Sequence, residues 1–145
     1  MLSEVDIAWA AGFFDGEACV GLYPNKRANG TIVYKSSISV SQVVRAPLEK
    51  LQEMFGGVID ANPARGNFQT IWIWRIGGLS GDAALTTMRP YMRVKGRQVD
   101  ALLGFRGITK RRGLQGRLTP EEIAVREGIS LTLRAMKKDG ASYAQ

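Results

Sequence analysis

The alternation of apolar and polar residues between positions 31 and 44 predicts a long β-strand with two different faces. Ile38 and Val40 share one side of such a strand, because successive side chains point in opposite directions. The other side carries a polar row: Lys35, Ser37, Ser39 and Ser41. This pattern is typical of a sheet that helices cover on one face only.

The residues before this strand predict a helix and a first strand. Ser3 and Asp6 resemble a helix-capping box and stand at the start of an apolar run, so we expect a helix over residues 4–15. Residues 18–23 have the composition of a strand, which we expect to end at Pro24.

A second cycle of elements follows. We expect a helix over 46–55, strands over 58–62 and 68–76, a helix over 80–88, and two further helices over 94–109 and 119–138. The first seven elements have the order αββαββα, which predicts an α+β fold. We expect residues 1–112 to form its core and residues 113–145 to form a linker and a C-terminal helix packed on that core.

Composition narrows the chemistry that this chain can perform. It has 145 residues, one cysteine (Cys19) and no histidine. One cysteine excludes an intramolecular disulfide, and the lack of histidine excludes Ser-His-Asp catalysis, Cys-His catalysis and Cys/His zinc sites. An enzyme of this composition depends on carboxylates, Lys, Arg, Tyr or a metal bound by oxygen atoms.

The charge is uneven along the chain. The formal net charge is +7, and residues 86–117 contain nine basic residues against one acid. A basic surface of this kind favours a polyanion, either a nucleic acid or an acidic membrane, although a solvated face without a partner has the same composition. The helix over 94–109 has only Phe105 as a bulky aromatic, which disfavours the membrane.

We expect a protein that neither crosses a membrane nor is secreted. No apolar run approaches the roughly 20 residues of a membrane span, and the first residues lack the basic or amphipathic character of a targeting segment. The expected location is the cytoplasm of a prokaryote or its phage, or an organelle.

The first helix carries an unusual stripe of small residues. Helical spacing places Ala8, Ala11, Gly12 and Asp15 on one face. Small side chains in register allow two helix backbones to approach closely, and from spacing alone the second helix belongs equally well to this chain or to another copy.

Residues 10–17, Ala-Ala-Gly-Phe-Phe-Asp-Gly-Glu, resemble the LAGLIDADG motif of the homing endonucleases. In that motif a helix of small and apolar residues ends at a pair of acids, and Glu17 stands at the position of the second acid. Ala10 replaces the usual Leu, and Ala18 replaces the usual final Gly. The αββαββα order, Gln42 near the end of the long strand, and the segment from Pro90 to Lys95 extend the resemblance.

The resemblance implies a homodimer with one active site built from both copies. Each chain has one motif, so the motif helices would pack about a two-fold axis through Ala8, Ala11, Gly12 and Asp15. The carboxylate of Glu17 and the carbonyl of Gly16 would bind Mg²⁺. Mn²⁺ is expected to substitute, and Ca²⁺ is expected to bind without supporting cleavage.

Three other residues match catalytic positions of the family. Gln42 would position the attacking water, and Lys95 would lie beside the scissile phosphate. Arg45 is a weaker candidate for a peripheral basic residue, because the junction that carries it is shorter than in some relatives.

The resemblance also implies a saddle-shaped antiparallel sheet that lies along the major groove of DNA. The candidate DNA-binding residues are Asn25, Arg27, Lys35, Ser37, Ser39, Arg65, Asn67, Gln69 and Arg75. Residues 68–76 are apolar on both faces, so the pattern leaves open which face meets DNA. Lys110, Arg111 and Arg112 are expected to contact phosphates.

The sequence therefore predicts a divalent-metal-dependent, site-specific DNA endonuclease of the homing type, often intron-encoded, that makes a double-strand break in a long, roughly palindromic site. The alternative is a non-catalytic relative, either an intron RNA maturase or a DNA-binding regulator. The motif acid Glu17 favours the enzyme, because non-catalytic relatives often lose it.

Overall fold

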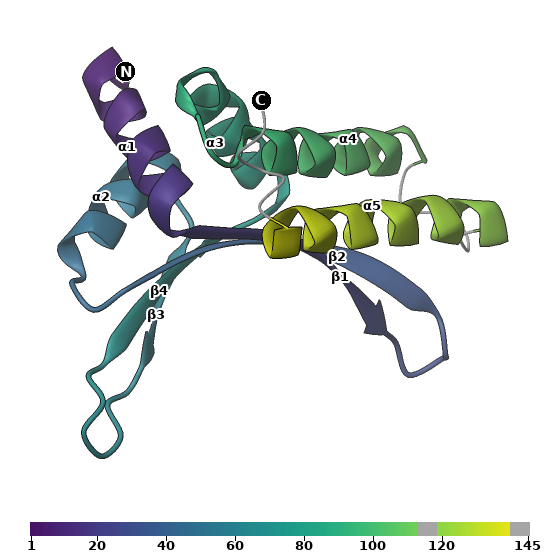
Figure 1. The fold of residues 1–145 in the computed structure, drawn as a ribbon, viewed down its shortest axis with the longest axis horizontal. Coiled ribbons are helices and arrows are strands. Elements are labelled where there is room, and N and C mark those ends of the chain that lie inside the picture. The colour runs from purple at the N-terminus through teal and green to yellow at the C-terminus, as the bar shows by residue number, and fades with distance from the viewer. Residues whose placement is uncertain (113–118, 140–145) are drawn as a thin grey trace. The chain divides into compact units, whose positions relative to one another are not determined.

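The computed structural model describes residues 1–112 and 119–139 (Figure 1). The elements are α1 (Glu4–Glu17), β1 (Ala18–Lys26), β2 (Ile32–Gln42), α2 (Ala46–Phe55), β3 (Val58–Asn62), β4 (Ile71–Ile76), α3 (Gly78–Met88), the 3-10 helix η1 (Arg89–Tyr91), α4 (Gly96–Arg112) and α5 (Pro120–Asp139). The strand order is β1-β2-β4-β3, and β4 pairs antiparallel with both of its neighbours. The predicted α+β fold with αββαββα order is confirmed.

Two strands differ from their predicted bounds by three residues at one end. β1 continues through Pro24 to Lys26 because it is an edge strand, where a proline removes no hydrogen bond on the open side. β4 begins at Ile71 because the residues before it form a turn, in which the N–H of Phe68 donates to the carbonyl of Arg65 over 3.0 Å.

The chain forms two compact units, each made of two separate segments of the sequence. The first unit contains Met1–Cys19 and Ile38–Arg93, and the second contains Val20–Ser37 and Val94–Gln145. The expected linker lies outside the described residues.

The first unit is built around one apolar face of its strands. Ile38, Val40, Trp74 and Ile76 are buried, and the register pairs Val40 with Trp74 and Ile38 with Ile76. α2 packs against β3 and β4, and α1 packs against α3. The predicted inward direction of Ile38 and Val40 is confirmed.

Trp74 is fixed by the turn that joins α2 to β3. Its indole N–H donates to the carbonyl of Gly56 over 2.9 Å. Gly57 follows with φ +87°, and a Cβ at this position would lie 2.5 Å from the carbonyl oxygen of Arg75. The close approach of this turn to β4 therefore requires glycine.

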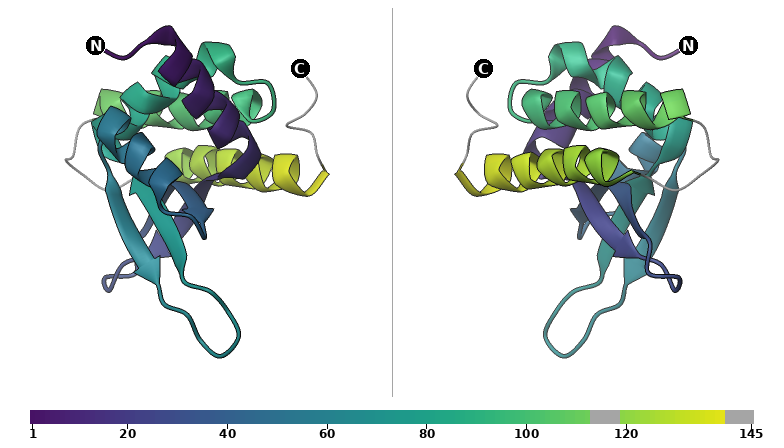
Figure 2. Two further views of the ribbon diagram at one scale, coloured as in Figure 1. Left: turned by 90° about the vertical axis from the view of Figure 1, so that its left-hand side faces the viewer. Right: turned by 90° about the vertical axis from the view of Figure 1, so that its right-hand side faces the viewer.

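In the second unit, α5 packs along α4 (Figures 1 and 2). The hydroxyl of Ser130 in α5 donates to the carbonyl of Leu22 in β1 over 2.5 Å. Phe105 of α4 is buried, and the guanidinium of Arg126 lies 5.6 Å from the centre of its ring. Burial raises the pKa of Tyr34, and the nearby Glu127 raises it further.

Within residues 1–112 and 119–139, no helix combines the length and the apolarity that crossing a membrane requires.

Candidate functional site

Glu17 is the last residue of α1, and both it and Gly16 are exposed. The last four carbonyls of a helix have no partner within the helix. One of them is satisfied here, because the N–H of Ala18 donates to the carbonyl of Phe14. The end of α1 thus exposes a carboxylate next to backbone carbonyls, which is a set of oxygen ligands suited to a hard cation.

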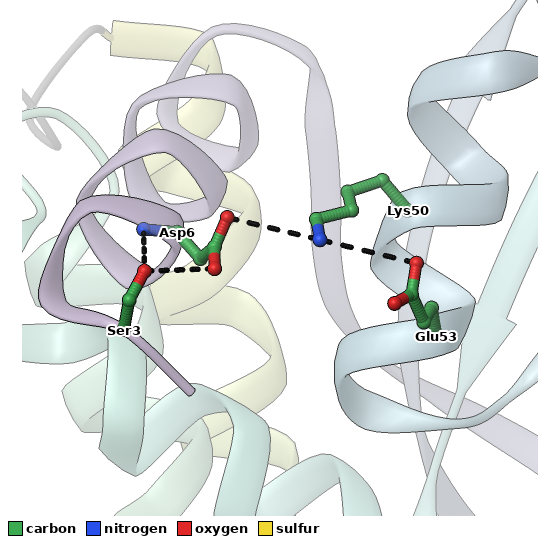
Figure 3. A network of polar contacts seen from close by, with 4 residues as sticks. All are labelled: Ser3, Asp6, Lys50 and Glu53. Atoms are coloured by element: carbon green, nitrogen blue, oxygen red, sulfur yellow. Dashed lines mark hydrogen bonds and ion pairs between the residues drawn. The ribbon is translucent and has the colours of Figure 1, made fainter. Parts of the chain in front are cut away.

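The start of α1 is tied to its neighbours in the first unit. The hydroxyl of Tyr91 donates to Glu4 over 3.0 Å, and this hydrogen bond raises the pKa of Tyr91. Lys50 of α2 lies 3.7 Å from Asp6 and 3.9 Å from Glu53 (Figure 3). These contacts join the start of α1 to η1 and α2.

The end of α1 is anchored through Asp15. This side chain is 8% exposed, and it accepts a hydrogen bond of 2.5 Å from the backbone N–H of Arg93. Ala11 is 0% exposed. In the single chain, Ala11 and Asp15 of the predicted small-residue stripe are therefore buried.

A different face of α1 is exposed. It carries residues at the spacing of one helical stripe: Val5, Ala8, Trp9, Gly12 and Gly16. Val5 is 78% exposed, and Trp9 stacks on Phe13 with ring centres 5.5 Å apart. Of the four predicted interface residues, Ala8 and Gly12 belong to this apolar stripe.

Gln42 and Arg45 are both neighbours of Trp72 in the first unit. Gln42 pairs with Trp72 across β2 and β4, and the guanidinium of Arg45 lies 4.7 Å from the centre of the Trp72 ring. The Nε of Arg45 also lies 2.9 Å from Glu49. Sequence reasoning did not single out Trp72 or Glu49, although the i, i+4 spacing of Arg45 and Glu49 is a usable signal.

Lys95 belongs to the second unit, whereas Glu17, Gln42 and Arg45 belong to the first. Lys95 is half-buried and immediately precedes α4, where its carbonyl accepts from the N–H of Val99 over 3.0 Å.

The strands of the first unit have one exposed face, and the sequence pattern did not show which residues of β4 lie on it. Since Trp74 and Ile76 point into the core, Arg75 points to the opposite side with its cross-strand partner Ser39. The side chain of Arg75 reaches Asp60 on β3, with Nη1 2.5 Å from Oδ2. Sequence reasoning missed Asp60, because a single acid in a short strand carries no signal of its own.

The loop between β3 and β4 carries three further DNA-binding candidates: Arg65, Asn67 and Gln69. A hollow of about 360 Å³ lies here, lined by Asn62, Pro63, Arg65, Phe68, Gln69 and Ile71. Phe68 is 79% exposed. Figures 1 and 2 show this loop at the opposite end of the hairpin from α2.

The remaining candidates lie in the second unit. Asn25, Arg27 and Lys35 are exposed, and Ser37 is half-buried. The side chains of Lys110, Arg111 and Arg112 lie outside those that the structure describes.

Among the described residues, no group of three or more Asp, Glu, Cys or His side chains is placed to hold a metal ion. The carboxylate of Glu17 and the neighbouring carbonyl of Gly16 are two oxygen atoms of the kind that a hard cation accepts. Divalent cations require more ligands than these, so a second chain, water or a phosphate must supply the rest.

Comparison with solved structures identifies the fold. The archaeal intron-encoded homing endonuclease I-Vdi141I, in complex with DNA, superimposes with a TM-score of 0.74 at 16% identity, over 90% of this chain and 83% of that chain. This chain has the homing endonuclease fold. I-CvuI, in complex with the I-CreI target in 2 mM Mg, gives a TM-score of 0.71 at 18% identity, over 92% and 82%.

The homing endonuclease I-TnaI shares this fold with a TM-score of 0.64 at 18% identity, and the match covers 92% of this chain and 97% of that chain. Comparisons with protein-family models and with curated proteins give no match.

Proposed function

We propose that this chain is a site-specific, divalent-metal-dependent DNA endonuclease of the homing type. The observation that carries the proposal is the exposed carboxylate of Glu17 at the end of α1, the helix of the LAGLIDADG-like motif, in a chain with the homing endonuclease fold. The net charge of +7 supports DNA as the substrate.

The active enzyme is a homodimer that associates through α1. The exposed stripe of Val5, Ala8, Trp9, Gly12 and Gly16 supports this, because an apolar helix face with small residues suits close packing against its own copy. A two-fold axis along this face brings two copies of Glu17 together. The second copy of Glu17 adds a carboxylate to the oxygen ligands at the end of α1.

Glu17 and the carbonyl of Gly16 hold the cation in each copy, and Mg²⁺ accepts these oxygen donors. When bound, the cation supplies a hydroxide nucleophile and stabilises charge on the leaving oxygen. Mn²⁺ substitutes for Mg²⁺, and Ca²⁺ binds without supporting cleavage.

The other residues of the site orient the reactants. The amide of Gln42 holds the attacking water by hydrogen bonds. Lys95 places a positive charge beside the scissile phosphate, and Arg45 binds the flanking backbone. The stacking of Arg45 on Trp72 supports this role, because a guanidinium held on a ring loses less freedom when it binds a phosphate.

DNA recognition uses the exposed side of the strands. Arg75 and Ser39, with Asn25, Arg27, Lys35 and Ser37, present polar groups to base edges in the major groove, and Arg65, Asn67 and Gln69 contact DNA at the hairpin loop. The product is a double-strand break in a long, roughly palindromic site, as expected of a symmetric dimer that cuts both strands.

Cleavage of a DNA library tests the proposal. Linear duplexes with a randomised region of about 24 base pairs are incubated with the protein in Mg²⁺, and the broken molecules are sequenced. We expect one enriched, roughly palindromic site. Glu17→Gln should abolish cleavage of that site and keep binding in Ca²⁺, and Glu53→Gln removes the same charge from the exposed side of α2 as a control.

Two outcomes contradict the assignment. If Glu17→Gln cleaves at the wild-type rate, Glu17 does not bind the catalytic metal. If the wild-type protein binds a site but breaks no duplex in Mg²⁺ or Mn²⁺, the chain is a non-catalytic relative.

A further inference from the structure

We propose that Arg75 and Asp60 act together as a guanine-reading pair, in which Arg75 contacts the base and Asp60 is a positioning residue. The inference rests on the proposed function. It names the base that the exposed face of the strands recognises and the residue that determines this preference.

The two residues lie on neighbouring strands and reach each other along a diagonal. Arg75 pairs directly with Val58 on β3, and Asp60 is two residues further along that strand, on the same face. The Nη1 of Arg75 lies 2.5 Å from Oδ2 of Asp60. Both side chains are about half exposed, 51% for Arg75 and 55% for Asp60, so the pair is accessible to a ligand on this face.

The pair leaves the base-reading edge of the arginine available. A guanidinium has five N–H donors, and the hydrogen bond to Asp60 uses one of them. Nη1 keeps its second hydrogen and Nη2 keeps both. These donors match the O6 and N7 acceptors of guanine, which present the arrangement that arginine binds in a bidentate manner.

Asp60 contributes direction and selectivity. A long exposed side chain loses rotamer freedom when it binds, and a partner that already holds it reduces this loss. A guanidinium held in one orientation presents two parallel donors, which match the two acceptors of guanine but not the single acceptor of thymine or the donor of cytosine, so the wrong bases are penalised as well as the right one favoured. The negative charge of Asp60 weakens binding to every DNA sequence, because phosphates repel a carboxylate whatever the base sequence.

The neighbours of the pair agree with contact to bases. Ser39, the cross-strand partner of Arg75 on β2, is small and polar, and Val58 on the other side is 57% exposed. Neither side chain is long enough to shield the guanidinium from a base edge.

The competing explanation is that Arg75 and Asp60 form a surface ion pair that only stabilises the fold. The base preference of the variants distinguishes this explanation from base reading. Wild-type protein and variants select sites from a randomised duplex library in Ca²⁺, and dissociation constants are then measured for the four base pairs at each selected position. The variants are Arg75→Ala, Arg75→Lys and Asp60→Asn. Arg65→Ala serves as a comparison for a basic residue outside the pair, and Glu53→Gln as the charge-matched control for Asp60.

We expect one position in each half-site where the wild-type protein prefers guanine. Arg75→Ala should reduce that preference by about tenfold or more and leave the other positions unchanged. Arg75→Lys should keep the affinity and lose the preference, since lysine has no planar fork. Asp60→Asn should reduce the preference at the same position and strengthen binding to unrelated sequences, whereas Glu53→Gln should change neither.

The inference is overturned if Arg75→Ala weakens all sequences equally, or if Asp60→Asn leaves the preference at that position within about twofold of the wild type. Either result leaves the proposed nuclease intact. If the wild-type protein selects no sequence at all, the proposed function fails and the inference fails with it. Thermal unfolding of each variant checks that the fold is retained.

Discussion

The carboxylate of Asp15 accepts a hydrogen bond from the backbone N–H of Arg93 over 2.5 Å. These residues are 78 positions apart, and the contact joins the end of α1 to the segment after η1. Asp15 is two residues before Glu17, so only Gly16 separates the acid that stabilises the helix end from the acid proposed for catalysis. The two acids of the motif thus have separate tasks, one inside the fold and one on its surface.

Asp15→Ala should lower the free energy of unfolding by roughly 1–3 kcal/mol, because it leaves the N–H of Arg93 without its carboxylate acceptor in a part-buried site. Urea denaturation measures the change. Asp6→Ala, which removes an exposed acid from the same helix, should cost about 1 kcal/mol or less. Equal losses in the two variants would show that the buried contact stabilises the fold no more than the exposed one.

Trp72→Ala should slow DNA cleavage more than it weakens DNA binding. The ring holds the guanidinium of Arg45 at 4.7 Å from its centre, and a stack of this kind contributes about 0.5–1 kcal/mol at an exposed site, which corresponds to a few-fold change in rate. Trp72→Phe keeps an aromatic face and should retain most of the activity. Single-turnover cleavage at saturating protein separates the rate from the affinity. A loss of the same size in Trp72→Phe would argue that Trp72 acts through packing.

Gly12→Leu should prevent dimerisation while leaving the chain folded. A Cβ at Gly12 meets no atom within 4 Å, and leucine has a higher helix propensity than glycine, so the substitution is tolerated within one chain. Across a close helix contact, however, the larger side chain separates the backbones. Sedimentation equilibrium should report a monomer, and cleavage should be lost. Gly104→Leu in α4 is the matched control, because that glycine also has open space around it. A dimeric, active Gly12→Leu variant would place the interface elsewhere.

Gly57→Ala should destabilise the first unit by roughly 2 kcal/mol or more. The residue has φ +87°, and a Cβ would lie 2.5 Å from the carbonyl oxygen of Arg75, so strain from the backbone adds to a steric clash. Gly66 has φ +58° and open space around it. Gly66→Ala should therefore cost only the backbone strain, about 1 kcal/mol. The midpoints of thermal unfolding of the two variants are compared. Equal shifts would show that a Cβ at position 57 does not clash with the carbonyl of Arg75.

The hydrophobic pattern and the capping residues predicted those elements whose bounds are set by residues close by in the sequence. The bounds of α2 and β3 agree with the sequence analysis because Pro47 marks the start of the helix and two glycines separate it from the strand. β1 was expected to stop at Pro24, and it continues because the edge position of the strand is a property of the whole sheet.

The contacts of the candidate site were less accessible to sequence reasoning. The pattern of residues 71–76 is apolar on both faces, and only the burial of Trp74 and its hydrogen bond to Gly56 decide which face is inside. In α1, helical spacing grouped Asp15 with Gly12, but the contact of Asp15 with Arg93 depends on a segment 78 residues away. The pairing of Arg75 with Asp60 depends in the same way on the register of two strands.

The exposed stripe of α1 ends at Gly16, one residue before Glu17. Under the proposed function, association and catalysis share a single helix, so the enzyme switches on by mass action: the concentration of competent sites rises with the square of the concentration of free chains. A variant with a weakened interface would then lose cleavage at low protein concentration and regain it at high concentration. A variant changed at Glu17 would lose cleavage at both concentrations.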